Sequence, residues 1–121
     1  MGDRLFFFLA LSFMLAHEMD AIRCREWRII PGLSYLPDAK GFRLFILAHV
    51  PLYYVMLWAV IAGPDRAEVM VGLDIFFIVH LALHLLYTRS SANKFRGWIS
   101  WSLIVGAALF GAVDLLLTAG G

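Results

Sequence analysis

Four long apolar stretches, separated by short polar segments, dominate the pattern along the chain. They cover residues 5–22, 42–62, 69–87 and 97–118. Each is close to the ~20 residues that an α-helix needs to cross the ~30 Å hydrocarbon core of a bilayer. Because lipid offers the backbone no hydrogen-bond partners, such segments fold as helices and not as open strands. The pattern therefore predicts an all-α protein, a bundle of four transmembrane helices in a single domain over residues 1–121.

Composition supports this interpretation. Hydrophobic residues make up 62% of the chain, whereas a typical soluble domain has about 45–50%. Lipid must cover the excess of hydrophobic surface, so we expect the protein to be embedded in a lipid bilayer. The net charge of +1 excludes a broad nucleic-acid footprint. The single cysteine, Cys24, excludes an intramolecular disulfide.

The positive charges divide unevenly between the connections. On one side of the predicted bundle only Arg4 and Arg66 carry positive charge. The first and third connections carry the remaining eight basic residues, Arg23, Arg25, Arg28, Lys40, Arg43, Arg89, Lys94 and Arg96. By the positive-inside rule these two connections are cytoplasmic. We therefore expect both termini on the non-cytoplasmic side of the inner (cytoplasmic) membrane.

All four histidines fall inside the predicted helices. His17, His49 and His84 each lie five or six residues from a basic residue at the cytoplasmic helix end, and His80 lies nine residues away. At 1.5 Å per residue, these spacings place the imidazoles roughly 8–14 Å below the flanking charges. Ionisable side chains inside a membrane are costly, and their default interpretation is a functional site. Three helices are therefore predicted to bring imidazoles to nearly one level.

Spacing within the helices also indicates a shared site. His80 and His84 are four residues apart and lie on one helix face, and His17 and Asp20 are three apart. Imidazole nitrogens bind zinc and iron, and a carboxylate can complete the ligand set. We predict that Glu18 acts as a catalytic group that moves protons. The predicted ligands of a divalent transition metal, zinc or iron, are His17, Asp20, His49, His80 and His84.

A structural role is the alternative for each of these residues taken alone. A single membrane histidine is more often a helix–helix hydrogen-bonding group, which contributes only about 1 kcal/mol. Asp20 and Glu18 could instead pair with nearby arginines. Asp74 and Asp114 lie too far from the histidines to share an ion with them. They could form a second polar site or a proton path, pair with each other, or cap backbone groups.

Several functions remain open from the sequence. The first is a metal-dependent hydrolase that acts on a lipid-like substrate near the headgroups. The second is a haem-binding electron-transfer protein, with His49 and either His80 or His84 as axial ligands. The third is a small transporter, or an accessory subunit of a larger membrane complex, and a homo-oligomer is also compatible. The segment from His17 lacks the second histidine of the zinc-protease motif H-E-x-x-H, because Ala21 stands in its place.

Three segments carry a resemblance to a known group of proteins: His17-Glu18-Met19-Asp20-Ala21, Glu26-Trp27-Arg28 and Ala48-His49-Val50-Pro51-Leu52. Through them the chain resembles an uncharacterised bacterial family of small four-helix integral membrane proteins. The resemblance implies the fold and no established activity. The combination of histidine and aspartate is also similar in kind to membrane zinc amidases of the ceramidase and adiponectin-receptor group, which have seven helices.

Overall fold

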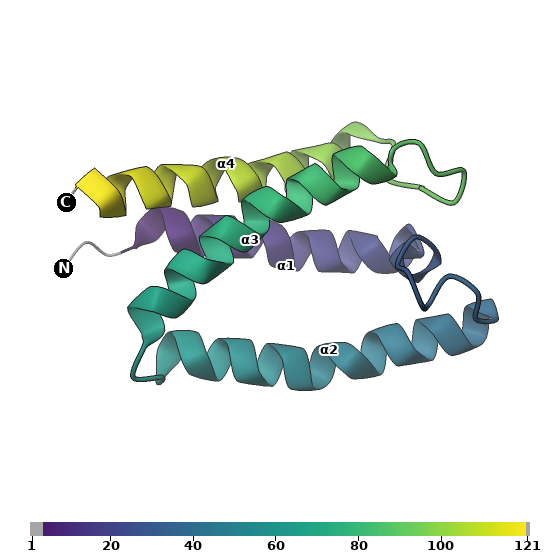
Figure 1. Cartoon of the computed structure of the whole chain (residues 1–121), viewed down its shortest axis with the longest axis horizontal. Helices are drawn as coiled ribbons and strands as arrows, with labels where there is room; N and C mark the ends of the chain where they lie inside the picture. The colour runs from purple at the N-terminus through teal and green to yellow at the C-terminus, as the bar shows by residue number, and fades with distance from the viewer. Residues whose placement is uncertain (1–3, 121) are drawn as a thin grey trace.

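The computed structural model describes residues 4–120, which fold into four long helices joined by loops and one short 3-10 helix (Figure 1). The described residues contain no β-strand, and the predicted all-α, four-helix class is confirmed. In chain order the elements are α1 (Leu5–Arg23), η1 (Glu26–Arg28), α2 (Asp38–Ile61), α3 (Arg66–Tyr87) and α4 (Trp98–Gly120).

Helix α2 begins four residues before the apolar stretch that indicated it. Pro37 precedes the helix, and its carbonyl oxygen accepts the backbone N–H groups of Lys40 and Gly41. Asp38 lies in the first turn, where a negative charge interacts favourably with the helix dipole and stabilises the helix. Hydrophobic patterning does not detect such a polar first turn, so the helix extends beyond the apolar stretch at this end.

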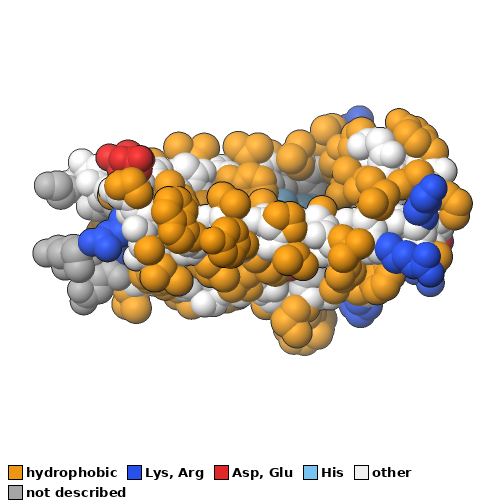
Figure 2. Space-filling view, turned by 90° about the horizontal axis from the view of Figure 1, so that it is seen from below, with side chains coloured by type: hydrophobic (Ala, Val, Ile, Leu, Met, Phe, Trp, Pro, Cys, Tyr) orange, Lys and Arg blue, Asp and Glu red, His pale blue; other side chains and the backbone are white. Residues whose placement is uncertain are grey.

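The four helices are long and apolar enough to span a bilayer. They contain 19 to 24 residues, which at 1.5 Å per residue is roughly 29–36 Å. Large hydrophobic side chains such as Leu47, Tyr54 and Leu116 are exposed on the outer surface. Figure 2 shows hydrophobic side chains over most of the visible face and most of the visible Lys and Arg atoms at one end. These features are those of a multi-pass integral membrane protein.

Helix α4 packs closely against α1 and α3 because small residues line the contact. A Cβ atom added to Gly106 would lie 2.5 Å from Cδ1 of Phe13, a ring of α1. A Cβ atom added to Gly111 would lie 3.3 Å from the backbone oxygen of Asp74 in α3. Small residues at these positions let the three helices approach each other, as is common in membrane bundles.

Helix α2 lies to one side of the other three helices (Figure 1). Its few buried residues, Gly41, Phe45 and Val60, lie toward its two ends. At the first end Trp27 of η1 packs against Gly41, and the indole N–H of Trp27 donates a 2.9 Å hydrogen bond to Asp38. The middle of α2 therefore makes looser contact with the bundle than the ends do.

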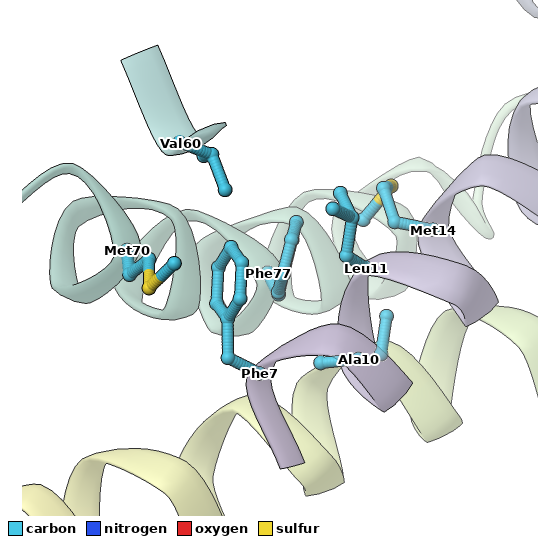
Figure 3. Packing of buried hydrophobic residues seen from close by; sticks show 8 residues of the cluster. Phe7, Ala10, Leu11, Met14, Val60, Met70 and Phe77 are labelled. Atoms are coloured by element: carbon cyan, nitrogen blue, oxygen red, sulfur yellow. The ribbon is translucent and has the colours of Figure 1, made fainter. Parts of the chain in front are cut away.

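An apolar core separates two polar groups along the bundle. The ionisable residues Arg4, Asp74 and Asp114 lie at the end where α1 begins and α4 ends, and the histidines of α1 and α3 lie toward the other end. Figure 3 shows side chains of α1 and α3 in this apolar core, with Phe7 beside Phe77. The core residues are Phe7, Ala10, Leu11, Met14, Val60, Met70, Phe77 and Ala107.

Candidate metal centre

Three separate elements bring three imidazoles and one carboxylate together. His17 comes from the last third of α1, and His80 and His84 come from successive turns of α3. The fourth member, Glu26, begins the 3-10 helix η1. The chain reverses direction here after α1 ends, since Arg25 adopts a left-handed backbone conformation with φ of 53°. This turn directs Glu26 back toward the histidines.

The distances between the ligand atoms fit a single metal ion. The Nε2 atoms of His80 and His84 are 3.1 Å apart, and Nε2 of His84 is 3.3 Å from Oε1 of Glu26. Nε2 of His17 and Nε2 of His80 lie 3.8 and 4.0 Å from the same oxygen. All four ligand atoms lie within 4.8 Å of one another. Tetrahedral zinc with bonds of 2.0–2.1 Å places its ligand atoms roughly 3.4 Å apart, so small shifts of these side chains are enough.

The imidazoles are buried and lack hydrogen-bond partners for several of their nitrogens. His17 is fully buried, and His80 and His84 are 8% and 3% exposed. Within residues 4–120, neither nitrogen of His17 nor the Nδ1 atoms of His80 and His84 have a hydrogen-bond partner. An unsatisfied buried polar group costs about 1–3 kcal/mol. Metal ligation would give His17 the partner that the protein does not supply.

Aromatic packing closes the centre on the side of the α3–α4 loop. The ring of Phe95, which is fully buried, lies 4.6 Å from the ring of His84 and 5.3 Å from that of His17, between ring centroids. The three imidazoles also pack edge to face, with centroid separations of 4.5–5.0 Å. This packing fixes the ring orientations and restricts the access of water.

Glu26 is the member of the group that sequence reasoning missed. Burial raises the pKa of its carboxyl, but the nearby imidazoles of His17 and His84 outweigh burial and hold the pKa at about 2. Glu26 is therefore ionised at neutral pH and suits a divalent cation. It was the one acidic residue near the start of an otherwise basic connection, which was the available signal. The chain reversal at Arg25 could not be foreseen from spacing.

His49 and Glu18 pair with each other outside this group. Nε2 of His49 lies 2.8 Å from Oε2 of Glu18, and its Nδ1 lies 2.6 Å from the backbone oxygen of Phe45. Both ring nitrogens of His49 are therefore engaged. The sequence-based ligand set included His49 on the basis of depth, but α2 lies to one side and turns this imidazole toward Glu18.

Asp20, also in the sequence-based ligand set, forms a different network. Its carboxylate accepts hydrogen bonds from Arg23 Nε at 2.8 Å and from the Ser100 hydroxyl at 2.5 Å. The carboxylate thus leans toward α4, although Asp20 is only three residues from His17. Asp74 and Asp114 likewise lie apart from the histidines, and the side chains of both contact the guanidinium group of Arg4.

The geometry favours a metal ion over a haem. Axial ligands of a haem stand on opposite faces of a flat macrocycle. His80 and His84 contact each other directly, and His17 packs against both. His49, the other residue expected as an axial ligand, is bound to Glu18. A compact group of three imidazoles and one carboxylate could hold one ion.

Fold and site together define a small four-helix protein whose helices can span a membrane and whose His/Glu cluster could hold a metal. The chain belongs to a family of unknown function, DUF6713, whose model matches residues 3–120. This confirms the resemblance to an uncharacterised family of small helical proteins. No curated protein and no solved structure matches the chain.

Proposed function

We propose that this protein is a membrane metalloprotein that binds one divalent transition metal ion, zinc or iron. The ligands are His17, His80, His84 and Glu26. The observation that carries the proposal is the convergence of four buried ligand atoms, from three elements, within 4.8 Å of one another. By the positive-inside rule, the basic connections support a location of the centre in the cytoplasmic half of the inner membrane.

A metal explains this cluster better than a purely structural role does. Three protonated imidazoles in contact would repel each other in a medium of low dielectric constant, and Glu26 can neutralise only one of their charges. Neutral imidazoles would leave buried nitrogens without partners. Three neutral imidazoles and one carboxylate around a divalent cation avoid the repulsion and give Nε2 of His17 a partner. Apolar side chains at these positions would stabilise an ordinary bundle core more simply.

A hydrolase that acts on a lipid-like substrate is the activity that we propose for this centre. A catalytic metal needs one position that is free of protein ligands. Glu26 lies on the short helix η1 and is the most exposed of the four ligands, so it is the ligand that we expect to leave the metal and free this position. Figure 2 shows histidine surface within a hollow on the face where α2 lies. In this proposal, a lipid-like molecule approaches the centre from that face.

Glu18 is then the proposed proton-transfer group. It follows His17 in the sequence, and its side chain is 18% exposed and paired with His49. The substitution Glu18→Gln is expected to retain the metal and to lower hydrolysis of lipid amides or esters by roughly 100-fold or more, as the loss of a general acid–base does. Activity that is unchanged in this variant would remove Glu18 from the mechanism.

The direct test of metal binding is elemental analysis of the purified protein. We expect about one zinc or iron ion per chain after purification in detergent without added chelator. A visible spectrum of the same sample separates a non-haem ion from haem, because only haem gives a Soret band. A protein without stoichiometric metal, which also takes up none on titration with zinc or ferrous iron, would overturn the proposal.

A further inference from the structure

A second buried polar cluster lies at the opposite end of the apolar core. It joins Arg4 at the start of α1, Asp74 in α3 and Asp114 in α4. Arg4 Nε lies 2.7 Å from Oδ2 of Asp114, and Arg4 Nη2 lies 3.2 Å from Oδ2 of Asp74. The two aspartates are buried, and the guanidinium is partly exposed.

The two carboxylates differ in the number of donors they receive. Oδ2 of Asp114 contacts both Nε and Nη2 of Arg4. Its other oxygen, Oδ1, accepts a 3.1 Å hydrogen bond from the backbone N–H of Phe7. Asp114 thereby caps the first turn of α1 from a neighbouring helix, where an anion is favoured. Asp74 receives only the longer Arg4 contact, and its Oδ1 atom is buried without a hydrogen-bond partner.

The cluster contains two carboxyl groups but only one positively charged group. Among residues 4–120, Arg4 is the only Lys, Arg or His side chain within ion-pair distance of either carboxylate. Two ionised carboxylates on one guanidinium would leave a net negative charge in an apolar layer, beside the core residues Phe7 and Phe77. Neighbouring carboxylates that share a site do not both stay ionised, and an uncompensated buried charge is very costly.

We propose that Arg4, Asp74 and Asp114 form a proton-binding site in which Asp74 carries one proton and Asp114 remains ionised. The bound proton makes the cluster electrically neutral. Arg4, whose side chain is 18% exposed, connects the site to the aqueous phase at the end of the bundle where α1 begins. The site shares no residue with the metal centre and does not depend on it.

Infrared spectroscopy of the full-length protein in detergent at neutral pH tests this proposal. A protonated carboxyl group has a C=O stretching band that ionised carboxylates lack. The difference spectrum between wild type and Asp74→Asn is expected to contain this band, with a shift in heavy water. In Asp114→Asn the band is also expected to disappear, because Arg4 then faces a single carboxylate and Asp74 ionises. The matched control is Asp38→Asn, at a half-exposed carboxylate that pairs with Arg28.

The Asp74→Asn variant tests the protonation of Asp74 even if Asp114→Asn fails to fold. Asparagine has nearly the shape of a protonated aspartate, so we expect Asp74→Asn to fold. Circular dichroism confirms the helical content of each variant. Loss of ionised carboxylate bands in Asp74→Asn, with no loss of the protonated band, would overturn the proposal. A protonated band that sodium or lithium ions abolish in wild type would also contradict it, because the site would then exchange a monovalent cation instead of holding a proton.

Discussion

Replacement of His84 by alanine is expected to abolish stoichiometric metal binding, whereas replacement of His49 leaves it intact. His84 Nε2 lies 3.1 Å from the His80 nitrogen and 3.3 Å from the Glu26 oxygen, so it lies at the middle of the proposed ligand set. Loss of a residue that only orients a ligand costs 10–100-fold in affinity. Loss of a ligand itself should therefore cost on the order of 100-fold or more, measured by metal titration in a competing chelator.

The comparison with His49 is a matched one. Both residues are histidines inside predicted transmembrane helices, but His49 is bound to Glu18 and the Phe45 carbonyl oxygen. Glu26→Gln provides a second test that leaves the helices intact and removes only the anionic ligand. Equal affinities for His84→Ala and His49→Ala, in variants with the same helical content as wild type, would refute the assignment of the ligands.

Removal of the metal is expected to lower the thermal stability of the protein strongly. A ligand that binds only the folded state stabilises it by about 4 kcal/mol when its free concentration is 1,000 times the Kd. For a chain of this size, that corresponds to a fall in Tm of more than ~10 °C. Without metal, the contacting imidazoles lose the cation that holds them together, and Nε2 of His17 has no partner. Thermal unfolding followed by circular dichroism, before and after chelation, measures the effect.

The His84→Ala variant is the control for this experiment. Added zinc or iron should restore the Tm of chelated wild type and should leave that of the variant unchanged. An equal rise in both proteins would mean that the metal acts elsewhere, for example at surface carboxylates. An unchanged Tm of wild type after complete removal of the metal would exclude an important contribution of the ion to the folded state.

The fold was accessible from sequence because a membrane imposes simple constraints. Four apolar stretches of sufficient length had to become helices, since the backbone has no other way to satisfy its hydrogen bonds in lipid. The same reasoning could not show how α2 sits, because its apolar residues point in all directions. Its position depends on contacts at its ends, such as Trp27 against Gly41, which leave no periodic signature in the sequence.

The candidate site could be predicted only in part from the sequence. The depth of His17 and the four-residue spacing of His80 and His84 indicated one level and one face, and these three residues do come together. Depth alone did not specify the direction in which His49 and Asp20 point. Each of these two side chains found a closer partner, Glu18 and Ser100 respectively. Glu26 joins the site because the chain reverses direction at Arg25, and helical periodicity cannot predict such a reversal.

X-ray absorption spectroscopy of the purified protein tests the metal centre most directly. Measured at the edge of the metal that elemental analysis identifies, the spectrum should show four nitrogen or oxygen neighbours at about 2.0–2.2 Å. The multiple scattering typical of imidazole should correspond to three histidines, and to two in His84→Ala if any metal remains. A shell made only of oxygen atoms, without imidazole scattering, would show that the ion does not reside between α1, η1 and α3.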